Sequence, residues 1–278
     1  MDSSIGAAKK KSVSQPKPSL PPTVTVKDRT FASRSLGREA KYRVVLPANY
    51  GSTSHRYPVL FLLHGVFGGF ENWETLTDVT RYAGASEIII VTPDAANSWY
   101  VNSATEPSQR YEDFIIQDLI PDVDEAFRTL RSSHRRAIAG LSMGGYGALK
   151  FAIKYPGAFD FAGSISGAFN GSYDLDAQRE DVRDDLLKAF GPAGSNTRRE
   201  NDIFEVLRKA DPKQLPYFYL DCGTGDEFCD VNRRLTAALR ECGARYEYHE
   251  VPGDHSWQYW DQRIATLLPI VSKMITAA

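Results

Sequence analysis

The chain has 278 residues, enough for one large domain, and its composition of 42% hydrophobic and 24% charged residues is that of an ordinary globular protein. A formal net charge of −2 provides no electrostatic attraction for nucleic acid or an anionic membrane. No stretch approaches the roughly 20 consecutive apolar residues that a membrane span needs. We therefore expect no nucleic-acid partner and no membrane span, and the oligomeric state stays open.

The first 22 residues differ in composition from the rest of the chain. Residues 1–22 are rich in Ser, Pro and Lys and contain nothing able to build a core, so a flexible tail is predicted there. Three consecutive lysines precede no apolar stretch, and the sequence as given therefore has no signal peptide. The default compartment is then the cytoplasm, with secretion open for a processed or truncated form. Residues 23–278 are expected to form a single domain.

Alternating and apolar runs along the chain predict the strands. Two β-rich stretches at 23–31 and 38–47 favour an antiparallel hairpin. Six short apolar or β-rich runs follow, at 57–65, 87–93, 135–140, 159–167, 215–223 and 245–253. Continuous apolar runs of this length are typical of strands that are covered on both faces.

Amphipathic stretches alternate with these runs and predict helices at 111–130, 144–156, 230–243 and 257–275. Pro121 is expected to kink or split the first of them. Strand–helix alternation favours a mostly parallel central sheet with helices on both faces. The interval 169–212 is polar and holds two short helical patterns, 181–191 and 201–210, so we interpret it as an insertion near the mouth of a site.

Ser142 lies in the motif Gly140-Leu141-Ser142-Met143-Gly144, which directly follows a predicted strand and precedes a predicted helix. In that context G-x-S-x-G forms a sharp turn that exposes a serine nucleophile. The turn forces unfavourable backbone angles, and Cβ atoms at 140 and 144 are expected to collide with neighbouring chain. The sequence therefore predicts a nucleophile rather than an ordinary turn serine.

A serine hydroxyl needs a base within hydrogen-bond reach and a third group that orients the base. Where G-x-S-x-G joins a strand to a helix in a parallel sheet, the acid follows the serine in the chain and the histidine base follows the acid. Only His249 and His255 follow the serine. His249 lies inside a predicted strand, whereas His255 lies in the loop after it, where α/β sheets place their chemistry. His255 is therefore the predicted base.

The acid is expected in the loop after the preceding strand. Asp226 follows two turn glycines and is the predicted acid, with Glu227 in reserve. Asp221 is assigned to the strand itself, and Asp230 to the start of the next helix as a cap. Asp254 is interpreted as a solvated loop residue, because neighbours in sequence seldom orient each other's side chains.

An oxyanion hole needs two backbone N–H groups that point at the developing charge. Met143, the residue after the nucleophile, is one predicted donor. Val66 is the other, in a loop after the first core strand where Gly68 and Gly69 allow the chain to bend back. His64 precedes the serine in the chain and is expected to brace this loop.

Aromatic residues near the predicted site are candidates for substrate binding. Phe67 is placed at the pocket mouth, and Trp99 and Tyr100 either line the pocket or pack beneath their loop. Trp257 and Trp260 begin the last helix and are expected to brace the base.

Three cysteines, Cys222, Cys229 and Cys242, are an odd number without metal-ligand spacing. They are expected to be buried or free thiols, with one disulfide left open. No metal or cofactor is expected.

Six blocks of the sequence together resemble the esterase D-like branch of the α/β-hydrolases. They are LLHGVFGGFENW, NSWYVNS, RYEDFIIQDLIPDVDEAFR, AGLSMGGYGALKFAIKYPGAFD, DCGTGDEF and VPGDHSWQYW, in the same order, and the resemblance covers residues 24–275. The branch includes feruloyl, acetylxylan and tributyrin-type esterases, S-formylglutathione hydrolases and the mycolyltransferases of the antigen 85 group. The resemblance implies the α/β-hydrolase fold, the triad Ser142, Asp226 and His255, and the oxyanion donors Val66 and Met143.

The oxyanion loop HGVFG at 64–68 differs from the Ser-Gly-Leu-Thr-Cys type usual in S-formylglutathione hydrolases and looks most like the loop of feruloyl-esterase-type members. Mycolyltransferases place Asp-Gly where this chain has His-Gly. The resemblance therefore favours a serine esterase that acts, through an acyl-enzyme, on short-chain or aryl esters of the feruloyl or acetyl type, free or linked to polysaccharide. An acyltransferase and a thioesterase stay open. A non-catalytic binding module is disfavoured, because all three triad side chains are present.

Overall fold

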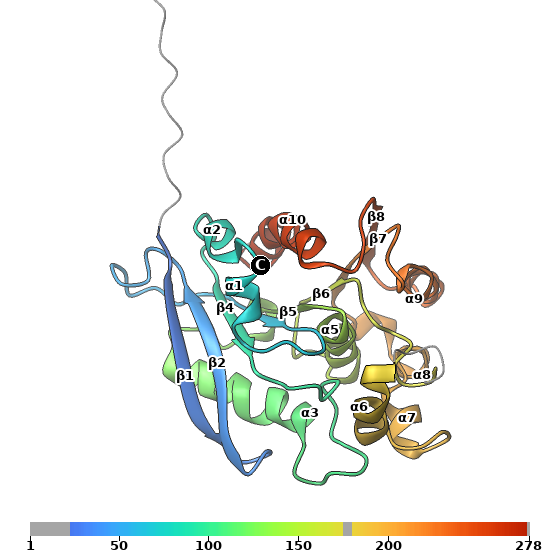
Figure 1. Cartoon of the computed structure of the whole chain (residues 1–278). Helices are drawn as coiled ribbons and strands as arrows, with labels where there is room; N and C mark the ends of the chain where they lie inside the picture. The colour runs from blue at the N-terminus through green and yellow to red at the C-terminus, as the bar shows by residue number, and fades with distance from the viewer. Residues whose placement is uncertain (1–22, 175–179, 277–278) are drawn as a thin grey trace, which may run out of the picture.

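One sheet of eight strands forms the centre of the protein, in a computed structural model that describes residues 23–174 and 180–276 (Figure 1). The predicted tail at 1–22 and part of the predicted insertion, 175–179, lie outside the described residues. The strands are β1 Thr25–Ser33, β2 Arg38–Leu46, β3 Val59–Leu63, β4 Ile89–Pro93, β5 Arg136–Leu141, β6 Phe161–Ile165, β7 Tyr217–Gly223 and β8 Tyr246–Val251. They lie in the order β1-β2-β4-β3-β5-β6-β7-β8.

The strand pairing confirms the predicted sheet. β1 and β2 form an antiparallel hairpin, β2 joins β4 antiparallel, and every later pairing from β4 through β3 to β8 is parallel. Strands β3, β4 and β6 are buried along their whole length, as expected for strands covered on both faces. The carboxyl ends of the parallel strands consequently meet at one edge of the sheet.

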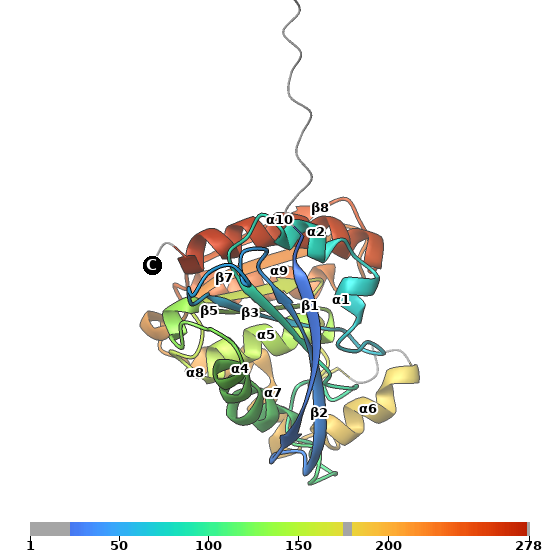
Figure 2. The same cartoon turned by 90° about the vertical axis from the view of Figure 1, so that its left-hand side faces the viewer.

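Helices cover both faces of this sheet. They are α1 Asn72–Thr75, α2 Val79–Ala83, α3 Tyr111–Asp113, α4 Ile120–Ala126, α5 Met143–Lys154, α6 Glu180–Phe190, α7 Asn196–Asn201, α8 Ile203–Lys209, α9 Cys229–Glu241 and α10 Trp257–Thr276. Figures 1 and 2 place α2 and α10 on one face, and α4, α5 and α8 on the other. None of the helices in the described residues is both long and apolar enough to cross a membrane.

The alternation of side chains along the strands divides the core in two. Leu60 and Leu62 of β3 pack with α2 and α10, whereas Val59, Phe61 and Leu63 of the same strand pack with α5. Each strand thus contributes successive side chains to opposite faces. This arrangement fixes β3 and β5 side by side beneath α5.

The stretch around Pro121 is helical without a break from Tyr111 to Ala126, so the predicted split is not formed. Its hydrogen-bond pattern changes from π-helical at Phe114–Leu119 to α-helical at Ile120, one residue before the proline. Three short helices, α1, α2 and α7, were not predicted, because four to six residues carry too little periodicity to be recognised.

The three cysteines are free thiols. Cys222 and Cys229 are buried, and Cys242 is partly exposed. The prediction of buried or free thiols is therefore confirmed, and the disulfide that the sequence left open is not formed.

Candidate active site

Ser142 lies on a strained turn between β5 and α5. Its backbone has φ +52° and ψ −120°, a conformation that L-residues adopt rarely and only where the surroundings enforce it. A Cβ atom at Gly144 would lie 2.5 Å from the Leu63 carbonyl oxygen and 2.6 Å from that of His64, and one at Gly140 would lie 2.5 Å from the Gly144 backbone. The predicted collisions at 140 and 144 are thus confirmed.

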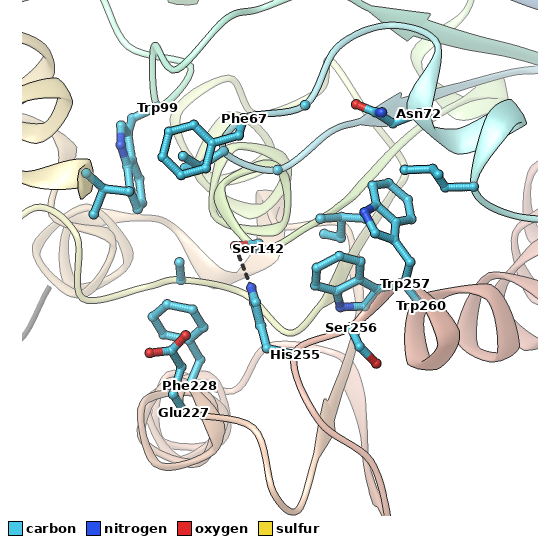
Figure 3. Close-up of a pocket in the computed structure, with 17 residues that line it drawn as sticks. Phe67, Asn72, Trp99, Ser142, Glu227, Phe228, His255, Ser256, Trp257 and Trp260 are labelled. Carbon is cyan, nitrogen blue, oxygen red and sulfur yellow. Dashed lines mark hydrogen bonds between the residues drawn. The ribbon is translucent and has the colours of Figure 1, made fainter. Parts of the chain in front are cut away.

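A continuous chain of hydrogen bonds joins Ser142, His255 and Asp226. The Ser142 hydroxyl lies 3.1 Å from His255 Nε2, and His255 Nδ1 lies 3.0 Å from Asp226 Oδ2 (Figure 3 shows the first bond). With the ring proton on Nδ1, the serine donates to the histidine and the histidine donates to the carboxylate. The residues follow β5, β8 and β7, so the sheet brings their side chains together at its carboxyl edge.

Asp226 is held as a buried carboxylate. Only 6% of the residue is exposed, and Oδ1 accepts a hydrogen bond of 2.8 Å from the Phe228 N–H. Burial by itself raises the pKa of this carboxyl, but the hydrogen bond and charge of His255, the Phe228 amide and the Ser166 hydroxyl lower it, and the net pKa lies below its usual value. The group is therefore ionised at neutral pH and can orient the imidazole.

Aromatic rings hold His255 on two sides. Its ring centroid lies 5.1 Å from that of Phe228 and 4.9 Å from that of Trp260, both edge-to-face. The Trp260 indole N–H donates to Ser166 Oγ over 3.3 Å, and Trp257 packs edge-to-face on Trp260 at 5.0 Å. The predicted bracing role of Trp260 is confirmed, and both tryptophans also line the pocket.

The alternative acids have other partners. Asp221 is buried in β7 and binds the Tyr259 hydroxyl and the Arg263 guanidinium. Glu227 is exposed at the pocket and makes no hydrogen bond to His255 among the described residues.

The prediction that Asp230 caps a helix is wrong. Helix α9 begins at Cys229 with Phe228 as its N-cap, and Asp230 lies in the first turn, where its carboxylate pairs with Arg233 at 2.8 Å. Acidic groups are favourable throughout a first helical turn, so composition alone does not distinguish the cap from the next turn positions.

His64 braces the loop after β3, as predicted. Its Nδ1–H donates to the Gly65 carbonyl over 2.7 Å, and its Nε2 accepts from the Ala95 N–H over 3.0 Å. These two contacts fix one neutral tautomer, and burial lowers the pKa of the ring. The histidine therefore holds the loop as a neutral ring whose two nitrogens are both hydrogen-bonded.

The two predicted oxyanion donors flank the serine. Val66 lines the pocket and Met143 is the first residue of α5. Within residues 23–174 and 180–276, neither backbone N–H has a hydrogen-bond partner. Both amides are thus free to bind an oxygen atom of a substrate.

A pocket of about 350 Å³ opens over Ser142 and His255 (Figure 3). Its walls are largely aromatic and aliphatic, and they comprise Gly65, Val66, Phe67, Gly68, Asn72, Leu76, Trp99, Leu141, Ala168, Val182, Glu227, Phe228, Ser256, Trp257 and Trp260. Phe67 is 60% exposed at the mouth, and Trp99 is 2% exposed in the wall. Two of the three predicted substrate-binding residues therefore line the pocket.

Tyr100 does not line the pocket, so the substrate-binding role predicted for it is wrong and the alternative, packing beneath the loop, is the one observed. The side chain is completely buried, its hydroxyl donates to the His64 carbonyl over 3.0 Å, and its ring packs against Gly147 of α5. Trp99 and Tyr100 both have φ +54°, and this irregular turn directs adjacent side chains to different environments. Tyr100 supports the loop from beneath instead of lining the pocket.

Several lining residues were not predicted. Val182 comes from α6 and lies within the predicted helical pattern 181–191, but the pattern does not reveal which face meets the pocket. Leu76 lies just after the block that carries the oxyanion loop, and Phe228 lies two residues after the predicted acid. Proximity to those motifs is the signal that could have identified them.

Comparisons with known proteins agree with this architecture. The Esterase family model matches residues 33–270. Esterase Rv1288 of Mycobacterium tuberculosis (strain ATCC 25618 / H37Rv) is 31% identical over 252 residues, which are 81% of this chain and 54% of that protein. The chain therefore spans about half the length of this curated relative.

Solved structures show the same fold. FphF, a fluorophosphonate-binding serine hydrolase of Staphylococcus aureus, is 27% identical with a TM-score of 0.81, and the match covers 90% of this chain and 98% of that one. A ferulic acid esterase is 25% identical with a TM-score of 0.77, and the match covers 91% and 99% of the two chains. The chain therefore belongs to the Esterase family and has the α/β-hydrolase fold.

Proposed function

We propose that this protein is a serine carboxylic-ester hydrolase in which Ser142 is the nucleophile, His255 the general base and Asp226 the residue that orients the base. The observation that carries the proposal is the hydrogen-bonded chain from Ser142 through His255 to a buried Asp226, which opens into a pocket. This arrangement is what a weakly nucleophilic hydroxyl needs in order to attack a carbonyl at neutral pH. Membership of the Esterase family supports the same reaction class.

In the first step Ser142 Oγ attacks the ester carbonyl as His255 Nε2 takes the hydroxyl proton. The carbonyl oxygen becomes an oxyanion, and the N–H groups of Val66 and Met143 stabilise it. Asp226 stabilises the imidazolium and keeps its Nδ1 proton directed at the carboxylate. The imidazolium then protonates the leaving alcohol, and the acyl group stays on the serine.

In the second step a water molecule donates its proton to His255 and attacks the acyl-enzyme. The same two amides stabilise the second oxyanion, and collapse of the intermediate releases the carboxylic acid and returns the proton to Ser142. No step requires a metal or a cofactor.

The size and walls of the pocket favour small acyl groups or an aryl ring. About 350 Å³ lies at the small end of ligand sites, and Phe67, Trp99, Phe228, Trp257 and Trp260 provide aromatic surface. The similar solved structure of a ferulic acid esterase supports an aryl ester, and short-chain acetyl-type esters fit the same space. Polysaccharide-linked esters belong to the same proposal, because the mouth is open beside Phe67.

A glutathione thioester is a poorer candidate. Among the described lining residues there is no lysine or arginine to bind the carboxylates of glutathione, and the ionisable side chains there are His255 and Glu227. An acyltransferase uses the same triad with an alcohol in place of water, and nothing in the pocket favours it over hydrolysis. We therefore propose hydrolysis.

The test compares the wild type with Ser142→Ala on p-nitrophenyl acetate, p-nitrophenyl octanoate and methyl ferulate. We expect kcat to fall by about 10⁴-fold or more in the variant, as for removal of a triad nucleophile. Ser52→Ala is the matched control, since Ser52 is an exposed turn serine outside the pocket. Equal, near-background rates in the wild type and Ser142→Ala would refute the proposed function.

A further inference from the structure

The oxyanion loop is held from one side by a single turn of chain. Three hydrogen bonds run from residues 95–100 to residues 64–67. The Ala95 N–H donates to the His64 ring over 3.0 Å, and the Tyr100 hydroxyl donates to the His64 carbonyl over 3.0 Å. The third runs from the Phe67 N–H to Asn97 Oδ1 over 2.7 Å. These contacts bracket Val66, whose own N–H is left without a partner among the described residues.

The Asn97 bond acts on a strained residue. Phe67 has φ +61°, a left-handed conformation that a bulky side chain adopts at a cost in free energy. Its ring is 60% exposed, so packing around the side chain does little to enforce this conformation. The hydrogen bond from its N–H is a direct restraint on the peptide that follows Val66.

The other end of the same side-chain amide reaches α6. Asn97 Nδ2 donates to Asp185 Oδ2 over 2.7 Å. One side chain thus accepts from the oxyanion loop and donates to the segment between β6 and β7. A side-chain amide provides both an acceptor and donors, whereas a carboxylate only accepts.

Helix α6 is itself attached to the pocket wall. The Ala104 N–H donates to the carbonyls of Lys188 and Ala189 at 3.1 and 3.0 Å, and Phe190 packs 5.9 Å from the Trp99 ring. Val182, on the same helix, lines the pocket. The position of α6 is therefore connected through Asn97 to the loop that carries Val66.

We propose that Asn97 is a positioning residue, which holds the Val66 N–H in place for the oxyanion by anchoring the Phe67 peptide to Asp185 of α6. The inference rests on the proposed function, because the oxyanion exists only if Ser142 attacks a carbonyl. Loss of the anchor lowers transition-state stabilisation more than substrate binding, since the oxyanion forms only during reaction. The expected signature is a fall in kcat with KM nearly unchanged.

The amide of Asn97 and the carboxylate of Asp185 can be exchanged between the two positions, because one hydrogen bond between an amide and a carboxylate then still forms. Asn97→Asp places two carboxylates face to face and should push α6 away from the loop. Adding Asp185→Asn restores one donor and one acceptor, because the new amide at 185 donates to the carboxylate at 97 while that carboxylate still accepts from the Phe67 N–H. A role limited to general stability does not predict recovery of kcat in this double variant.

The experiment measures kcat, KM and Tm with p-nitrophenyl acetate for the wild type, Asn97→Ala, Asn97→Asp and the double variant. We expect kcat to fall by about tenfold or more in both single variants, less than the 10²–10³-fold for loss of a whole oxyanion donor. We expect KM within threefold, by the order-of-magnitude argument that ground-state contacts stay in place. The double variant should recover most of the lost kcat.

Asn49→Ala is the matched control, because Asn49 also bridges two groups, the Tyr57 hydroxyl at 3.0 Å and Glu87 at 2.7 Å, outside the pocket. Wild-type kcat in both single variants, or a double variant no faster than Asn97→Asp, overturns the inference. If Asn97→Ala does not fold, the comparison of kcat between Asn97→Asp and the double variant still tests the inference. A wild type no faster than Ser142→Ala in the same series overturns the proposed function itself.

Discussion

Two of the regions that form the walls of this pocket are built differently. Around Ser142 the main chain of β3, β5 and α5 is in direct contact, so that Gly144 has no room for even a Cβ atom. Between β6 and β7 the chain reaches the pocket through side chains, chiefly Val182 of α6, and is connected to the oxyanion loop by the Asn97–Asp185 hydrogen bond.

This difference suggests different roles for the two regions: the main chain around Ser142 supports the reaction, and the side chains of α6 select the substrate. A main-chain contact permits almost no substitution, because moving it displaces the sheet, whereas a side-chain contact can be changed with little effect on the backbone. We therefore expect substitutions in the turn from Gly140 to Gly144 that carries Ser142, called the elbow, to reduce stability and turnover together. Substitution of the α6 side chain that lines the pocket, Val182, should change which substrates bind.

The largest effect is expected at Glu112 of α3, whose partner Lys150 lies where the two regions meet. Its buried carboxylate pairs with Lys150 at 2.7 Å and Lys154 at 2.6 Å, both on α5, and Lys150 lies 3.4 Å from Asn201 of α7. Glu112→Gln leaves Lys150 buried without its carboxylate and should lower the free energy of unfolding by about 4 kcal/mol, measured by urea denaturation at pH 7. Glu205→Gln, which removes an exposed pair with Arg208, is the control and should leave the unfolding midpoint unchanged.

The same carboxylate predicts a pH dependence. Burial by itself raises the pKa of Glu112. The charges and hydrogen bonds of Lys150 and Lys154 lower it by more than that, so the net pKa is about 2 instead of the ordinary 4.5. Because the folded-state pKa is the lower one, this stabilisation is complete above about pH 4.5 and is lost as the pH falls towards 2. Glu112→Gln should therefore reduce the fall of Tm between about pH 4.5 and 2, because the substituted side chain has no proton to bind there. An unchanged acid slope would contradict the assignment.

The second effect isolates the elbow. Gly144→Ala adds a Cβ atom 2.5 Å from a backbone oxygen that cannot move without displacing β3, so the free energy of unfolding should fall by about 3 kcal/mol. Ester hydrolysis should fall with it, since the turn carries Ser142. Gly51→Ala is the matched control, because a Cβ there meets nothing within 4 Å. A Gly144→Ala enzyme with wild-type Tm and kcat would show that the main-chain contacts around Ser142 tolerate an added side chain, which contradicts the comparison.

The smallest effect is expected for substrate preference, on substitution of the α6 side chain that lines the pocket. Val182→Ala removes two methyl groups from the pocket wall and should raise kcat/KM for p-nitrophenyl octanoate relative to the acetate by roughly threefold to tenfold. The kcat for acetate should stay within about twofold of the wild type, because Val182 is a wall residue outside the hydrogen-bonded chain of Ser142, His255 and Asp226. Val206→Ala on α8, outside this pocket, is the control. A fall in kcat for both substrates would show that Val182 supports the reaction itself, as the elbow does, and does not select the substrate.

The sequence predicted the sheet and the hydrogen-bonded chain because both depend on signals that are local. The order of apolar runs determines the strands, and the turn glycines around Ser142 and before Asp226 mark where strands end. His255 then follows from chain order. The strand ends are short-range features that a single sequence displays directly, and the chain order expected for the fold connects the residues that follow them.

Pocket walls are different, because a core and a pocket are lined by the same apolar side chains. Nothing in the run Trp99-Tyr100 distinguishes the ring that faces the pocket from the ring that packs on α5, since an irregular turn has no period. The contribution of Val182 depends on how α6 is rotated, and Asn97 depends on a partner 88 residues away in the chain. Such features require the tertiary structure.

The order of the strands also has a consequence for how the protein is made. Ser142 follows β5, whereas His255 follows β8, the outermost and last strand of the sheet. A nascent chain synthesised as far as Glu241 holds Ser142 and Asp226 but not His255. If the proposed function holds, a chain that stops before β8 therefore has no base with which to activate Ser142.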